Sequence, residues 1–142
     1  MQTYERSAIF LLLKAFYDVL GHDRIDRISV EYSLSHALFL LPSGRFQLDQ
    51  ALLEQVECRM KALADKAIPI RKHSVPTDDA IAFFREKQLY DKAKLLRFRM
   101  SSRVNYYELD GFPDYFYGYM VPDTGYVKNF KLELFQDGLI LR

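Results

Sequence analysis

The sequence predicts an α+β domain with a mainly antiparallel sheet and helices packed on one face of that sheet. Three observations predict this fold class. Apolar residues recur at helical spacing near the N-terminus, alternating strand-like residues dominate the last third, and two Asp-Gly pairs mark tight hairpin turns. The 142 residues, of which 49% are hydrophobic, are enough for one buried core. We therefore expect a single domain over residues 1–142.

The first element is predicted to be a helix that ends at Gly21, a residue suited to the left-handed position after a helix. Its apolar stripe consists of Ile9, Leu12, Leu13, Phe16, Val19 and Leu20. Phe10 and Leu11 make its first half apolar on nearly all sides. We therefore expect this helix to be buried on two sides, or covered by a segment outside this sequence.

The middle of the chain is predicted to alternate between strands and helices. Strands are expected at 28–32 and 37–41, with a loop at 42–44, and a further strand at 69–75. Asp49 is expected to cap a second helix, and Thr77 a third. A short fourth helix should open at Asp91.

The last third is predicted to consist of strands at 104–109, 115–121, 127–135 and 139–141. The Asp110-Gly111 and Asp137-Gly138 pairs are expected to form the turns of two hairpins, because such turns require positive φ. These hairpins predict the antiparallel pairing of the sheet.

Composition narrows the class of protein. A net charge of +1 gives no general attraction to nucleic acid or to anionic lipid. The single cysteine, Cys58, excludes an intramolecular disulfide and is typical of a reducing compartment. The longest apolar run, 8–13, is much shorter than the about 20 residues that a membrane-spanning helix needs. We expect a cytoplasmic protein without membrane contact.

Positive charge is concentrated between residues 85 and 103, where seven basic and two acidic side chains leave a local charge of +5. One interpretation is an anion site for an RNA backbone or a nucleotide phosphate, with Tyr106 and Tyr107 nearby to stack a base. The other interpretation is a solvated helical face, which such runs commonly form. The candidate anion-binding residues are Lys94, Arg97, Arg99 and Arg103.

The most informative motif is YFYGYMVPDTG at residues 115–125. It resembles the end of the editing domain of threonyl-tRNA synthetases and of the related alanyl-tRNA synthetase domain. In that family a Cys-x-x-x-His pair runs directly into a Val-Pro-x-Thr-Gly turn. The turn is kept here at 121–125, but Phe116 stands at the Cys position and Met120 at the His position.

The resemblance also implies where the other half of the family's site would lie. The family's first helix carries a His-x-x-x-His pair, and aligning its end with Gly21 places Arg6 and Phe10 at those two positions. In alanyl-type members such a quartet binds zinc. Arg, Phe and Met can neither replace those ligands nor transfer a proton. We therefore expect a degenerate site without catalytic residues or metal, in which Phe10, Phe116 and Met120 touch one another.

A closer resemblance joins the segments 30–36, 102–105 and 114–122. They look like the region that precedes the kinase domain in certain bacterial uridine kinase-like proteins, often after a small TGS domain. This resemblance implies that the chain is a fragment of a longer ATP-dependent uridine or nucleoside kinase, with that kinase domain as its partner. The sequence has no Gly-x-x-x-x-Gly-Lys-Ser/Thr motif, so ATP and Mg²⁺ are expected only in the kinase domain and no cofactor is expected here.

Three functional hypotheses follow. The first is a non-catalytic domain that regulates or positions the kinase, with RNA or a nucleotide as its candidate ligand. The second is an aminoacyl-tRNA deacylase that uses non-standard residues. The third is a structural or oligomerising module. The sequence leaves the ligand and the oligomeric state open.

Overall fold

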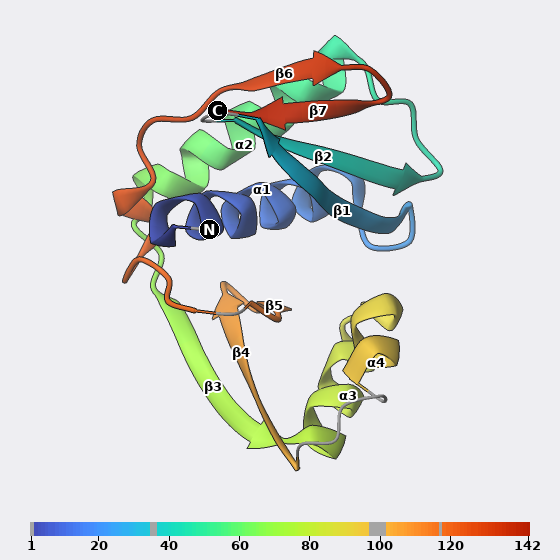
Figure 1. Ribbon diagram of the computed structural model, residues 1–142, viewed down its shortest axis with the longest axis vertical. Helices are drawn as coiled ribbons and strands as arrows, with labels where there is room; N and C mark the ends of the chain where they lie inside the picture. Colours follow the sequence, from blue (N-terminus) through green and yellow to red (C-terminus); the bar gives the residue numbers. More distant parts are fainter. Residues whose placement is uncertain (1, 35–36, 97–101, 117) are drawn as a thin grey trace.

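Two antiparallel sheets share a central helix in this fold (Figure 1). The computed structural model describes residues 2–34, 37–96, 102–116 and 118–142, and within these ranges it contains four α-helices. The predicted α+β class and the antiparallel pairing are confirmed. The strands form two sheets, however, where the sequence predicted one.

The larger sheet has the strand order β1-β2-β7-β6, with helices α1 and α2 packed against it. Its elements are β1 (Ile25–Leu34), β2 (Ala37–Gly44), β6 (Leu132–Phe135), β7 (Gly138–Leu141), α1 (Thr3–Leu20) and α2 (Gln50–Asp65). The loop predicted at 42–44 is instead the end of β2, where Pro42 lies opposite Ile28 of β1. Proline fits there because β7 pairs only with residues 38–40, which leaves this part of β2 at a sheet edge.

The smaller sheet has the order β3-β4-β5; α3 packs against it, and α4 packs against α3. Its elements are β3 (Ile70–Pro76), β4 (Arg103–Leu109), β5 (Phe112–Asp114), α3 (Thr77–Glu86) and α4 (Tyr90–Leu96). Asp110 and Gly111 both have positive φ, 51° and 81°, so the first predicted hairpin turn is confirmed. In the second hairpin the turn lies one residue earlier than predicted, at Gln136 and Asp137, because Phe135 pairs with Gly138.

Helix α1 lies between the two sheets, and this position explains its apolar surface (Figure 1). Residues 8–13 are all buried. On one side α1 packs against α2, and on the other Phe10 and Tyr17 contact Phe112 of β5, with ring centroids 5.9 and 5.2 Å apart. The expectation of a helix buried on two sides is therefore confirmed.

Of the predicted helix starts, the one at Asp49 is confirmed and the next two differ by one residue. The Asp49 carboxylate accepts a 2.9 Å hydrogen bond from the Leu52 N–H at the start of α2, as predicted. Thr77 is the first residue of α3, and Pro76 occupies the cap position. Helix α4 begins at Tyr90, one residue before the predicted Asp91. Among the described residues, no helix is long and apolar enough to cross a lipid bilayer.

The chain from 115 to 131 is irregular where strands were predicted. Strand β5 ends at Asp114, a short 3-10 turn, η1 (Thr124–Tyr126), follows, and pairing resumes only at Leu132. Backbone groups here find other partners: the Val121 N–H donates to Ser7 Oγ at 2.9 Å, and the Pro122 carbonyl accepts from the Ile70 N–H at 2.9 Å. This segment runs along α1 and forms the wall of the site described next.

Candidate functional site

The four positions singled out by the family resemblance lie together between α1 and the irregular segment. Phe10, which is fully buried, and Phe116, which is half-buried, have ring centroids 5.3 Å apart. Met120 packs against the same core, and its sulfur lies 3.5 Å from Ser7 Oγ. Two helix positions four residues apart thus face two positions four residues apart on the facing segment. The expected contact between Phe10 and Phe116 is present, and contact of Met120 with either ring stays a prediction.

Arg6 occupies the fourth position and holds the backbone of the facing segment. Its Nη1 donates a hydrogen bond to the Tyr119 carbonyl. Gly118, with a φ of 101°, makes room for the guanidinium, because a Cβ at this position would lie 2.7 Å from Arg6 Cζ. A permanently charged side chain therefore lies against the backbone where the resemblance implies a histidine.

The turn at 121–125 is fixed by buried polar side chains. Thr124 is fully buried; its Oγ1 accepts from the Ile68 N–H at 2.8 Å and donates to the Leu63 carbonyl at 2.7 Å. The Asp123 carboxylate accepts from the Gly125 N–H at 2.8 Å, which closes the turn locally. These bonds join the turn to the end of α2 and to the segment that leads into β3.

The side chains at the four positions do not fit a zinc ion. Zinc in proteins takes thiolate, imidazole or carboxylate ligands, and Arg6, Phe10 and Phe116 supply none of these. The Met120 thioether is a soft ligand that suits other metals. Among the described residues, no cluster of three or more His, Cys, Asp and Glu could hold a metal ion.

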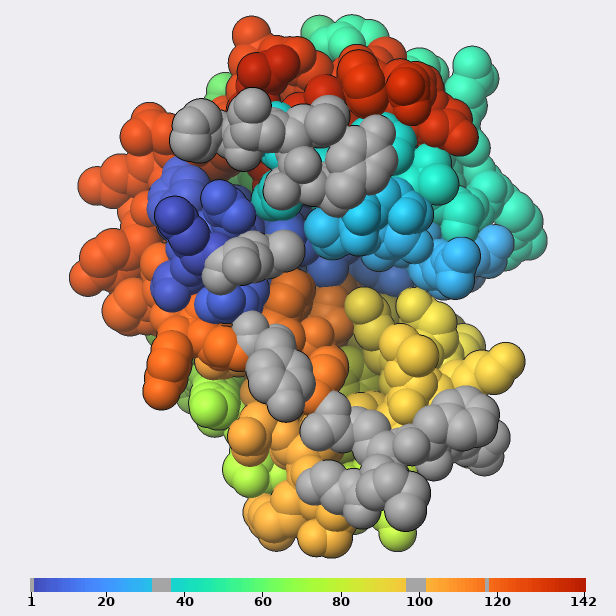
Figure 2. Space-filling view, in the orientation of Figure 1, coloured from blue at the N-terminus to red at the C-terminus, as the bar shows by residue number. Residues whose placement is uncertain are grey.

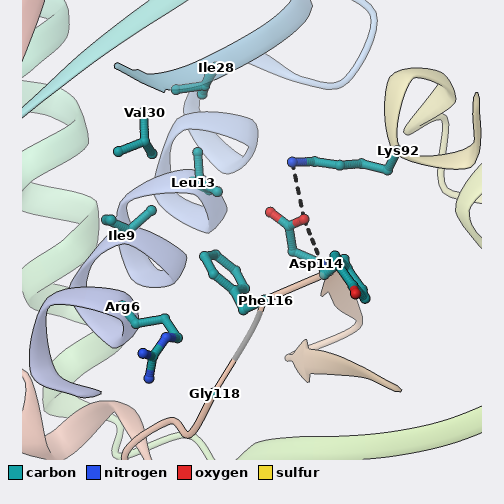
Figure 3. A pocket seen from close by; sticks show the side chains of 10 residues that line it. Arg6, Ile9, Leu13, Ile28, Val30, Lys92, Asp114, Phe116 and Gly118 are labelled. Carbon is teal, nitrogen blue, oxygen red and sulfur yellow. Dashed lines mark hydrogen bonds and ion pairs between the residues drawn. The ribbon is translucent and has the colours of Figure 1, made fainter. Parts of the chain in front are cut away.

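A pocket of about 690 Å³ opens beside the four positions, within the range of roughly 300–1,000 Å³ that is typical of small-molecule sites. Its walls come from α1, β1, α4, residues 114–116 and Gly118. Figure 2 shows β1 above and α4 below on the face where these elements meet. Arg6 and Phe116, two of the four positions, lie on its lining together with Gly118, so the pocket adjoins the former site (Figure 3).

An ion pair between Lys92 and Asp114 lines the same pocket, and the sequence analysis did not identify it. Lys92 Nζ reaches from α4 to 3.1 Å from Asp114 Oδ1, which also accepts from the Tyr115 N–H at 2.7 Å (Figure 3). Asp114 is 1% exposed, and its second oxygen, Oδ2, has no hydrogen-bond partner among the described residues. Asp114 stands directly before the motif, but Lys92 could not be told apart from the other basic residues of its segment.

Burial dominates the electrostatics of this pair. It raises the pKa of Asp114 to about 6, although the Lys92 ammonium opposes that rise. Burial also disfavours the charged form of Lys92, but attraction to Asp114 and Asp91 outweighs it and raises the Lys92 pKa. The pocket therefore holds a carboxyl group that changes its charge close to neutral pH.

The structure places only part of the candidate anion patch. Lys94 is exposed on α4, and Arg103 is exposed at the start of β4, where its Nη2 donates to the Ser74 carbonyl at 2.9 Å. Arg97 and Arg99 lie outside the described residues. Convergence of the four side chains therefore stays a prediction.

Tyr106 and Tyr107, in contrast, are not available to stack a base. Tyr106 is buried against Phe83, Phe84 and His73. Tyr107 is 5% exposed, and its hydroxyl donates to the Gly118 carbonyl at 2.5 Å. The base-stacking role suggested for these two rings is wrong, because both serve the core.

Comparison with known proteins relates the chain to threonyl-tRNA synthetases, although no family model matches it. It is 30% identical over 135 residues to the threonine–tRNA ligase of Syntrophotalea carbinolica, and this alignment covers 93% of this chain and 20% of the relative. It is 34% identical over 88 residues to that of Fusobacterium nucleatum, covering 61% of this chain and 14% of the relative. It is 35% identical over 81 residues to the threonine–tRNA ligase of Methylococcus capsulatus, an alignment that covers 56% of this chain and 13% of the relative.

The chain thus spans a fifth or less of the length of these relatives. Their similarity supports a domain like the editing domain of threonyl-tRNA synthetases. The antiparallel α+β architecture is consistent with such a domain.

Proposed function

We propose that this chain is a non-catalytic, editing-like domain that regulates or positions an attached nucleoside kinase domain. The observation that carries the non-catalytic part is the contact between the Phe10 and Phe116 rings, 5.3 Å apart, where the resemblance implies a histidine and a cysteine. Hydrolysis of an ester needs a group that activates water or attacks the carbonyl. Neither ring can do so, and Arg6 stays protonated.

The kinase part of the proposal is supported by the three segments that resemble uridine kinase-like proteins. In such a protein ATP and Mg²⁺ would bind in the kinase domain, and this domain would respond to a ligand of its own, with RNA or a nucleotide among the candidates. We propose a cytoplasmic location on the single cysteine, Cys58. Sequencing the gene on both sides tests the kinase context. A downstream P-loop would support it, and an open reading frame that lacks any kinase motif would refute it.

The non-catalytic part is tested by incubating the 142-residue chain with threonine-accepting tRNA that carries either serine or threonine as its ester. We expect release of the amino acid at the uncatalysed rate. An active threonyl-tRNA synthetase editing domain serves as the positive control. Hydrolysis above background that scales with the concentration of the chain would refute the proposal.

A second candidate is a deacylase that uses Asp114. The observation in its favour is that burial raises the pKa of this pocket carboxyl to about 6, a value suited to a general base near neutral pH. Under this alternative the chain hydrolyses Ser-tRNA or Thr-tRNA, and the Asp114→Asn variant loses that activity while keeping its fold. Activity that survives in Asp114→Asn would assign the hydrolysis to other residues.

A further inference from the structure

The pocket beside α1 combines an apolar wall with a charged pair on the opposite side (Figure 3). The charged side consists of Lys92 and Asp114. The apolar wall consists of Ile9, Leu13, Ile28, Val30 and Phe116. Such a division favours a ligand with an apolar body and a polar head, since small-molecule sites commonly pair an apolar lining with a few placed polar groups.

The second carboxylate oxygen of Asp114 identifies what the polar head should donate. Buried polar atoms are paired in nearly all native structures, but Oδ2 has no partner among the described residues. In Figure 3 the carboxylate points into the space between Lys92, Leu13 and Phe116. Neighbouring atoms cover this oxygen, so a ligand that reaches it has to displace part of the pocket wall. A hydrogen-bond donor on the ligand, best a charged one, would satisfy it.

The charges of the lining indicate a second group on the ligand. Ionised Asp114 carries one negative charge, whereas Lys92 and Arg6 carry two positive charges. A simple amine would add a further positive charge, and a simple carboxylate would leave Oδ2 unpaired. A zwitterion meets both conditions, because its ammonium can donate to Asp114 while its carboxylate faces the cations.

We propose that this pocket binds a free α-amino acid with an apolar side chain. Its ammonium donates to Asp114 Oδ2, its carboxylate faces the Lys92 ammonium in the positive potential that Arg6 reinforces, and its side chain packs against the apolar wall. This inference rests on the proposed non-catalytic function, in which the domain senses a ligand and does not hydrolyse one.

Binding should depend on pH through Asp114. Burial raises its pKa to about 6, so the carboxyl is ionised at pH 7.5 and largely protonated at pH 5. The charged groups that act on it are Lys92 and Asp91 from α4. Tyr17 of α1 also senses Asp114, but burial raises its pKa further above neutrality, so it does not titrate in this range. An ammonium ligand should therefore bind more weakly at pH 5 than at pH 7.5.

The test is calorimetric titration of the 142-residue chain with L-leucine, L-isoleucine and L-phenylalanine at both pH values. We expect saturable binding of at least one of them at pH 7.5. N-acetyl-L-leucine lacks the ammonium, L-leucinamide lacks the carboxylate and L-serine lacks the apolar body. Each should bind at least tenfold more weakly than the best apolar amino acid. These comparisons use the unaltered chain and so do not depend on the folding of a variant.

Variants then assign the contact. Asp114→Asn should weaken binding at least tenfold, whereas Glu86→Gln, the same charge change at an exposed position of α3, should leave it unchanged. Equal binding of leucine and N-acetyl-L-leucine, or no binding of any apolar amino acid at millimolar concentration, would overturn the inference. Those results leave the proposed function intact if the chain also hydrolyses no aminoacyl-tRNA. Hydrolysis would refute the proposed function whatever the titrations show.

Discussion

Replacing Asp114 by asparagine should remove a specific pH dependence of stability. Burial raises the pKa of this carboxyl from 3.8 to about 6 in the folded chain. Between these values the unfolded chain has lost the proton while the folded chain keeps it, so stability falls as the pH rises. The contribution is fully present below about pH 4 and is lost as the pH passes 6. A shift of about two pKa units at 1.36 kcal/mol each makes it about 3 kcal/mol.

The assay is urea unfolding of the unaltered chain and of Asp114→Asn at intervals from pH 4 to pH 7.5. Other carboxyl groups titrate in both proteins, so the informative quantity is the difference between their free energies of unfolding. Relative to Asp114→Asn, the unaltered chain should lose about 3 kcal/mol across this range. Loss of the ion pair to Lys92 in the variant adds a constant offset above pH 7 and does not imitate this slope.

Parallel profiles for the two proteins would refute the reasoning. So would an NMR titration in which the Asp114 carboxyl has a pKa of 4 or below. Either result would mean that attraction to Lys92, 3.1 Å away, outweighs the desolvation of a carboxyl that is 1% exposed. The pocket would then hold a permanently ionised pair at all physiological pH values.

Four further predictions concern the same site. Phe10→Ala should lower the free energy of unfolding, measured in urea, by about 3–5 kcal/mol, and Phe10→Leu by clearly less, because the ring is fully buried. A loss below about 0.5 kcal/mol for Phe10→Ala would contradict the packing. Gly118→Ala should cost about 1–3 kcal/mol from its positive φ, plus a clash with Arg6 that Arg6→Ala relieves, so the double variant should be only partly rescued. Thr124→Val should cost about 1–3 kcal/mol, because it leaves the Ile68 N–H and the Leu63 carbonyl without their hydroxyl partner; an unchanged midpoint would refute that role. Elemental analysis of protein purified without chelator should find no stoichiometric zinc, and near-unit occupancy would contradict the substitution argument.

The elements with strong local signals could be predicted from the sequence. The apolar surface of α1, the Asp49 cap and the Asp110-Gly111 turn each depend on residues close together in the chain. The segment 115–121 could not, because its alternating tyrosines imitate a strand. Its backbone partner Ser7 lies 114 residues from Val121, and no local pattern reports such a contact.

The candidate site was predictable to the same extent. The family resemblance, which placed Phe10 and Phe116 at two positions of one site, indicated that their rings would meet. Lys92 could not be identified, since only the tertiary fold brings its ammonium to Asp114, 22 residues further along the chain. The burial of Tyr106 and Tyr107 could not be predicted either, because tertiary packing places both rings in the core.

In the irregular segment beside α1, the residues that fix the backbone differ from the residues that stand at the positions of the family's catalytic side chains. Ser7 and Asp123 accept from backbone N–H groups of the segment and its turn, and Thr124 ties the turn to the Leu63 carbonyl and the Ile68 N–H. The Phe116 and Met120 side chains take no part in these bonds to the backbone. An exchange at either of these two positions therefore leaves the anchoring bonds intact. Such an arrangement lets a lineage discard or acquire an activity by side-chain replacement at constant architecture. The same scaffold can then be reused as a sensor without first being rebuilt.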